Sequence, residues 1–163
     1  MAKENILFRY ELTDAWGIQL SKVTVFKNKK VMYKYGDNKT KSCKLDDLSF
    51  KQIEDIIREH SVIFEYDSFE IEFPNVLDGV MNLFVFATQE GMRVDLMTFN
   101  IGEVRNPNAH FFKGLASSDE EDLPSYDIVP VKAKNIVETF DEIVDVLVRN
   151  GVSSKCLRLT YKR

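Results

Sequence analysis

Four short extended segments separated by tight turns occupy the first 45 residues, and this spacing constrains the fold more than any other feature. The segments span 6–12, 18–26, 31–35 and 41–45, and the apolar residues in them recur largely at period 2, as in β-strands. Turn-forming residues separate them, as in Asp14-Ala15-Trp16-Gly17 and Gly36-Asp37-Asn38. Connections of only about two to five residues favour hairpins. The N-terminal part is therefore predicted to be an antiparallel meander.

The second of these segments changes its apolar phase midway. Ile18 and Leu20 share one parity, whereas Val23 and Val25 share the other. One extra residue in a strand resets which side chains face inward. We therefore predict a β-bulge near Ser21-Lys22.

Two amphipathic helices are predicted. The first spans 49–60, with Ser49 and Gln52 as a capping box and with Leu48 and Ile53 at the spacing of a hydrophobic staple. The second ends at Asn150-Gly151, since glycine commonly terminates helices. Its apolar stripe consists of Ile136, Val137, Phe140, Ile143, Val144 and Leu147.

The remaining strands are predicted over 69–73, 80–88, 92–99 and 155–161. Segment 80–88 is apolar at both parities, which favours an internal strand. Gln89-Glu90-Gly91 suits a three-residue hairpin loop with Gly91 in the left-handed conformation. The order is four strands, helix, three strands, helix, strand. It predicts one α+β domain over 1–163, with a mainly antiparallel sheet, two principal helices on one face and a mobile acidic loop near 117–127.

Length and compartment signals agree with this expectation. The 163 residues suit a single domain, and 12 phenylalanines supply area for an ordered core. Charges interrupt the apolar start after three residues, and no apolar run approaches the length of a membrane span. Without a secretory signal, Cys43 and Cys156 are expected as reduced thiols. We expect a cytoplasmic protein that does not insert into membranes.

The tests for chemistry identify no catalytic or cofactor signature. His60 is explained by the end of a helix and His110 by a loop beside Phe111. The cysteines and histidines lack metal-ligand spacing, and no glycine-rich phosphate loop is present. Arg93 and Asp95 share a strand face, which favours a surface ion pair. We therefore expect no catalytic residues, metal or cofactor.

Charge distribution is the most informative functional feature. Residues 21–45 contain eight lysines and one acid, a charge of +7, whereas the whole chain carries −4 and the remainder therefore −11. Residues 65–78 contain five acids and no base. The domain is expected to be electrically bipolar.

The leading hypothesis is a non-enzymatic module that binds a protein partner through charged patches, because complementary charge steers association. Its candidate residues are Lys22, Lys27, Lys29, Lys30, Tyr33, Lys34, Tyr35, Glu70 and Glu72. The alternative is single-stranded nucleic-acid binding by the 22–44 meander, with Phe26 and the tyrosines stacking on bases. A purely structural explanation is that lysines protect outer strands from edge-to-edge aggregation. A second functional alternative is a small-molecule or hydrolase site between helices and sheet.

Overall fold

One six-stranded antiparallel sheet organises the part of the chain that the structure describes. The computed structural model describes residues 5–66, 80–102 and 125–160. The strand order is β4-β3-β2-β1-β5-β6, with every neighbouring pair antiparallel. The strands are β1 (Ile6–Thr13), β2 (Gln19–Phe26), β3 (Lys30–Tyr35), β4 (Lys41–Lys44), β5 (Met81–Ala87) and β6 (Arg93–Phe99).

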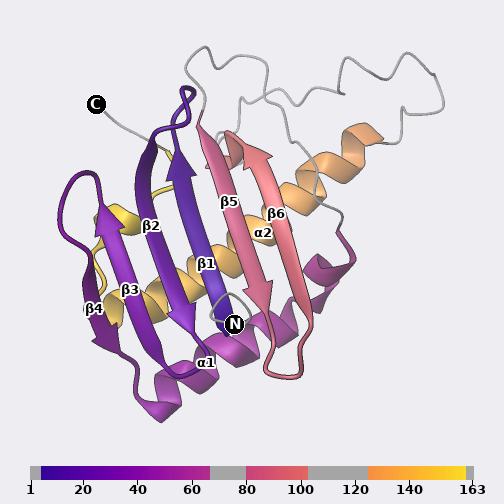
Figure 1. Cartoon of the computed structure of the whole chain (residues 1–163). Coiled ribbons are helices and arrows are strands. Elements are labelled where there is room, and N and C mark those ends of the chain that lie inside the picture. Colours follow the sequence, from indigo (N-terminus) through magenta and orange to yellow (C-terminus); the bar gives the residue numbers. More distant parts are fainter. Residues whose placement is uncertain (1–4, 67–79, 103–124, 161–163) are drawn as a thin grey trace.

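The helices lie on one face of this sheet (Figure 1). They are α1 (Asp47–Glu59) and α2 (Ser125–Arg149), with the short 3₁₀ helices η2 (Ser61–Glu65) and η5 (Ser154–Leu157). No described helix covers the opposite face, which we call the open face. The predicted α+β class, the N-terminal meander and the two principal helices are confirmed.

An aromatic cluster fixes α2 to the middle of the sheet. The Phe140 ring of α2 lies 4.7 Å from the ring of Tyr10 and 5.6 Å from that of Phe84. Phe8 lies 6.3 Å from Phe140 and 5.7 Å from Phe86. These are the centroid separations at which aromatic pairs attract. The cluster therefore packs α2 against β1 and β5.

The local predictions in the strands are largely confirmed. Leu12 pairs with Ser21 and Thr13 with Gln19, so Leu20 is the extra residue, next to the predicted bulge. Strand β5 is internal, between β1 and β6. Gly91 has a φ of +102° in the loop between β5 and β6, a conformation that glycine adopts without strain.

The start of α1 differs from the prediction. The helix begins at Asp47, and the N-cap is Asp46, whose carboxylate accepts a 2.6 Å hydrogen bond from the Ser49 amide. Ser49 is therefore inside the helix rather than its cap. Leu48 is 68% exposed, so the predicted staple is also wrong. Asp and Ser are comparable N-cap residues, so a cap at Asp46 is as favourable as one at Ser49.

The predicted strand over 155–161 is not formed in its described part. Residues 154–157 form η5 instead, and this 3₁₀ helix packs against β2 and β3. Cys156, Leu157 and Leu159 are buried. A segment lying across a sheet can bury alternate residues without pairing, and this produces the same sequence pattern as a strand.

Several predictions fall outside the described residues. They are the strand over 69–73 with Glu70 and Glu72, His110, and the acidic segment as far as residue 124. The last three residues of the predicted acidic loop, 125–127, belong to α2.

Asn82 joins three parts of the fold from a fully buried position in β5. Its amide nitrogen donates to the Tyr10 hydroxyl and to the Leu159 carbonyl, both at 2.9 Å. Its side-chain oxygen accepts from the Ile101 amide at 3.2 Å. Tyr10 in turn donates to the Arg158 carbonyl at 2.5 Å. The network therefore attaches the C-terminal segment to the sheet.

We predict that Asn82→Leu lowers the free energy of unfolding by about 2–4 kcal/mol, because it strips partners from buried backbone groups. Urea denaturation measures this. The matched control is Asn135→Leu, which removes one half-buried bond to the Tyr66 hydroxyl and should change stability by less than about 1 kcal/mol. Equal losses in the two variants would contradict the assigned role of Asn82.

The Asp46 cap predicts a pH dependence of stability. Hydrogen bonding from the Ser49 backbone amide lowers the pKa of Asp46 below its ordinary value. A carboxyl with a depressed folded pKa stabilises the fold above its unfolded pKa, and this is lost as pH falls through the folded pKa. Wild type should therefore exceed Asp46→Ala in stability at pH 7, and the difference should shrink below about pH 4.

Denaturation of both proteins from pH 7 to pH 3 tests this cap. Asp46→Asn is the control, because it keeps the oxygen acceptor without the titrating charge. Its stability relative to Asp46→Ala should not vary with pH. A constant difference between wild type and Asp46→Ala would refute the titrating cap.

Candidate binding face

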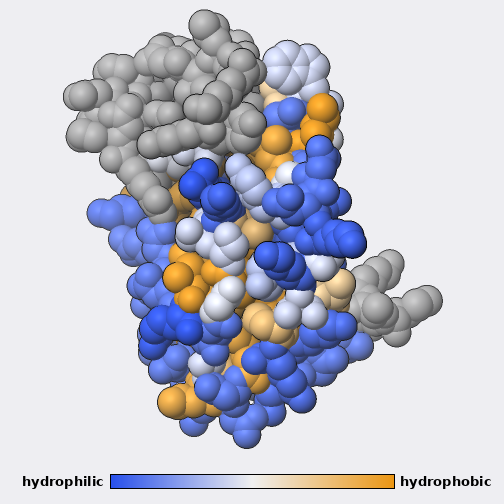
Figure 2. Space-filling model, turned by 90° about the vertical axis from the view of Figure 1, so that its left-hand side faces the viewer, coloured by the Kyte–Doolittle hydropathy of each residue, from blue (hydrophilic) through white to orange (hydrophobic). Residues whose placement is uncertain are grey.

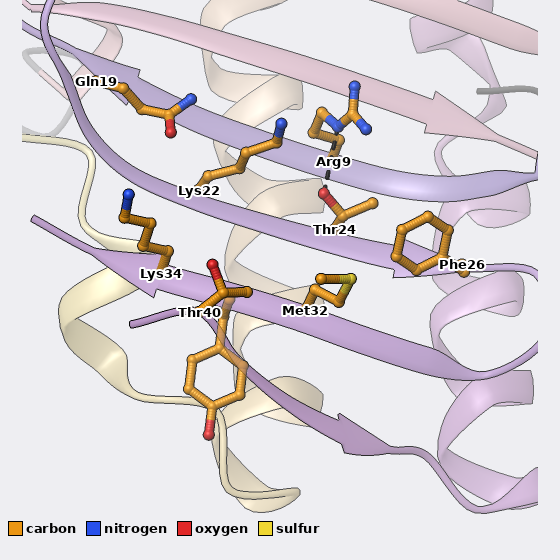
Figure 3. A pocket seen from close by; sticks show the side chains of 9 residues that line it. Arg9, Gln19, Lys22, Thr24, Phe26, Met32, Lys34 and Thr40 are labelled. Atoms are coloured by element: carbon orange, nitrogen blue, oxygen red, sulfur yellow. Dashed lines mark hydrogen bonds between the residues drawn. The ribbon is translucent and has the colours of Figure 1, made fainter. Parts of the chain in front are cut away.

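The pairing of β1, β2 and β3 places cations together on the open face. Arg9 faces Thr24 across β1 and β2, and Thr24 faces Met32 across β2 and β3. One step along the strands, Lys22 lies opposite Lys34. Figure 3 shows these side chains rising from adjacent strands on the same side of the sheet.

Two grooves that share Phe26 and Met32 run along this region. One has a volume of about 290 Å³ and the other about 510 Å³. Their linings contain the cations Arg9, Lys22, Lys34, Lys27 and Lys30, the polar residues Gln19, Thr24, Thr40, Asn5 and Asn28, and also Tyr33. No acidic residue of the described chain lines either groove. We call the combined feature the basic trough: the five cations with Phe26 and Met32 between them.

Like charges face each other across the strands of this region. Lys22 opposes Lys34, and Lys30 opposes Lys44 on β4. Directly opposed like charges destabilise a sheet. One acid moderates them: Glu11 forms a 3.4 Å ion pair with Lys22 from β1. Arg9 donates a 3.3 Å hydrogen bond to the Thr24 hydroxyl, which orients the guanidinium beside the trough.

The structure unites only part of the predicted site. Lys22, Lys30 and Lys34 share the open face, and Lys27 lies at the end of the trough. Lys29, in contrast, forms an ion pair with Asp47 of α1.

The predicted tyrosines lie on the other side of β3. Tyr33 pairs with the buried Val23, and its hydroxyl donates to the Gly151 carbonyl at 3.4 Å. The Lys155 ammonium lies 6.0 Å from the Tyr35 ring centre. Tyr33 therefore borders the trough only from β3, and Tyr35 does not line it, whereas the stacking hypothesis requires a row of exposed rings beside the lysines. Glu70 and Glu72 are outside the described residues.

Arg9 and Met32 are trough residues that sequence reasoning missed. Strand parity contained the signal for Met32, because it alternates with the buried Val31 and so shares a face with Lys30 and Lys34. Arg9 is the polar residue between Phe8 and Tyr10. Its position beside the lysines depends on the β1–β2 register, which the bulges shift.

Outside the trough, another groove of about 300 Å³ occupies the open face over β1, β5 and β6. Arg9 lines both this groove and the trough, and Glu11, Leu83 and Met97 contribute here. The predicted Arg93–Asp95 ion pair is confirmed, at 2.7 Å, on the same groove. This half of the face is charge-balanced, unlike the trough.

The other chemistry-bearing residues have local structural partners. His60 caps the C-terminus of α1 and its ring pairs with Glu142 of α2. Cys43 and Cys156 are free thiols, and burial raises the pKa of each, although the Lys41 charge opposes this at Cys156.

Within 5–66, 80–102 and 125–160, no three His, Cys, Asp or Glu residues cluster as metal ligands. None of the described helices is long and apolar enough to cross a bilayer.

Comparison with known proteins gives no match, either to a protein-family model or to a curated protein sequence. The geometry of the open face is therefore the basis for the proposed function.

The opposed lysines predict a stabilising substitution. Lys34→Glu replaces a repulsive cross-strand pair with an attractive one, and should raise the free energy of unfolding by about 0.5–1 kcal/mol. Urea denaturation at low salt measures the gain, which should diminish at high salt. Lys39→Glu makes the same charge change outside the strands and should give no comparable gain. Equal effects would show that net charge, not the facing position, is responsible.

Proposed function

We propose that the protein is a non-enzymatic intracellular binding module whose basic trough holds an extended acidic segment of a protein partner. The observation that carries the proposal is the convergence of five cations around Phe26 and Met32, in grooves lined by no described acid. Solubility alone does not require that cations gather on a surface without acidic residues among them. Complementary charge supplies attraction and orientation, and the apolar centre supplies contact area.

The dimensions of the trough suggest the form of its ligand. Lys22 and Lys27 are five residues apart in the chain, which corresponds to about 16 Å in extended conformation. An extended peptide of about five residues spans the same distance. Acidic residues near both ends would meet Lys22 and Lys34 at one end and Lys27 and Lys30 at the other. An apolar side chain between them would lie over Phe26 and Met32.

An acidic protein segment fits this surface better than single-stranded nucleic acid. Sequence-tolerant binding of single strands relies on successive exposed aromatic rings. Tyr33 contacts the groove, but its hydroxyl bonds Gly151 on the helix side, and Tyr35 lies beside Lys155. Phe26 lines both grooves of the trough and Tyr33 borders one of them, which suits one apolar anchor rather than a row of bases.

Fluorescence anisotropy with the labelled peptide Asp-Glu-Leu-Asp-Glu tests the proposal at about 50 mM salt. We expect binding that weakens as salt is raised, because the contacts are partly exposed and therefore screened. Lys22→Gln/Lys34→Gln should weaken affinity about tenfold, as expected for the loss of two exposed ion pairs. The matched control is Lys51→Gln/Lys134→Gln, which removes two exposed lysines from α1 and α2 and should bind as wild type does.

Two further arms separate the alternatives. The peptide Asp-Glu-Ser-Asp-Glu keeps the charges without the apolar anchor and should bind more weakly. A labelled oligo-dT of equal charge should also bind more weakly than the leucine peptide. Tighter binding of oligo-dT, or equal loss in the control variant, would overturn the proposal.

A further inference from the structure

A second basic pocket lies on the helix side of the sheet, next to the β4 edge. It forms where η5 packs across β2 and β3, and has a volume of about 190 Å³. Its lining includes Tyr33, Tyr35, Lys39, Lys41, Ser153 and Lys155. Figure 2 faces this edge, where hydrophilic residues surround smaller hydrophobic patches.

Strand β3 lies between this pocket and the trough, and its Tyr33 and Lys34 line both. Lys34 points into the trough, whereas Tyr33 and Tyr35, on either side of it in the sequence, belong to the opposite face. Lys41 pairs with Tyr33 across β3 and β4, so its side chain shares the helix-side face. Lys155 arrives from η5 and lies over the Tyr35 ring. The stretch 39–41 and η5 thus bring Lys39, Lys41 and Lys155 to one small space.

The charge in this pocket is not balanced by the described chain. No acidic residue lines it, and Lys39, Lys41 and Lys155 form no ion pair with a described acid. The Cys156 thiol, which is 1% exposed, forms part of the buried lining. The Ser153 hydroxyl accepts from the Lys155 amide and keeps its own hydrogen, so it adds a neutral donor. Cationic and hydroxyl donors facing a common space are the complement of an oxyanion.

We propose that this pocket binds one phosphate group, as the free anion or as a phosphomonoester. Phosphate esters carry about −1.5 to −2 charges at pH 7, so a phosphate matches three lysines better than a single carboxylate does. Each ammonium is a compact charge with three donors and can approach a tetrahedral anion from a different side. The pocket is smaller than the roughly 300–1,000 Å³ of sites for drug-sized ligands. A phosphate group fits this space, and a whole nucleotide does not.

Thermal denaturation of the full chain with increasing sodium phosphate at pH 7.5 tests the proposal, with ionic strength held constant by sodium chloride. A ligand that binds only the folded state raises the melting temperature with concentration, and the curve gives its affinity. Phosphate should raise the melting temperature, whereas acetate at the same ionic strength should not. Lys41→Gln/Lys155→Gln should weaken phosphate binding at least tenfold.

The controls separate a specific site from loss of structure. The single variant Lys155→Arg leaves Lys41 in place and keeps a cation over Tyr35. It should retain most of the phosphate binding of wild type. Lys22→Gln/Lys30→Gln removes two trough lysines that do not line this pocket and should bind phosphate as wild type does, so failure here and failure of peptide binding at the trough are distinguishable. Circular dichroism confirms that each variant is folded.

A parallel titration with O-phosphoserine distinguishes the two sources of the phosphate group. Tighter binding of O-phosphoserine supports a phosphomonoester ligand, and tighter binding of inorganic phosphate supports the free anion. An equal response to phosphate and acetate would overturn the proposal. So would unchanged phosphate affinity in Lys41→Gln/Lys155→Gln.

Discussion

The contact of Phe140 with Phe8, Tyr10 and Phe84 is the interaction on which the arrangement of the sheet depends. It holds α2 against β1 and β5, the two central strands, and so buries the helix-side face of the sheet in the core. Aromatic rings bury a large area and attract one another at these separations. With one face committed in this way, every alternate residue of the strands is directed to the open face, where charge can be tolerated.

Strand periodicity accounts for what could be predicted from the sequence. The alternation of Phe8, Tyr10 and Leu12 with Arg9 and Glu11 predicted β1, and the phase change between Leu20 and Val23 predicted the bulge. The C-terminal Leu157 and Leu159 show the limit of the method. Their alternation indicates only that one side of the segment is buried. A segment that crosses the sheet without pairing therefore has the same pattern as a paired strand.

The candidate site was predictable in composition but not in arrangement. The density of lysines between Ser21 and Leu45 is visible in the sequence, yet which of them share a face depends on register and pairing partners. Parity within β3 separates Lys34 from Tyr33 and Tyr35, and so divides the predicted lysine–tyrosine surface between opposite faces. Arg9 joins the lysines only because β1 pairs with β2 in the observed register, between two irregularities.

Edge protection explains some of the lysines but not the arrangement of the trough. Lys41 and Lys44 are on the edge strand β4, where positive charge discourages pairing with another chain. Lys22 is on β2, an internal strand with neighbours on both sides, so it protects no edge. It nevertheless faces Lys34, in a pairing that lowers stability. Destabilising arrangements of this kind are typical of functional surfaces, because binding requires charges that folding alone would not favour. We therefore propose ligand binding for Lys22 and Lys34 and edge protection for Lys44, whereas Lys41 serves both the edge and the pocket beside η5.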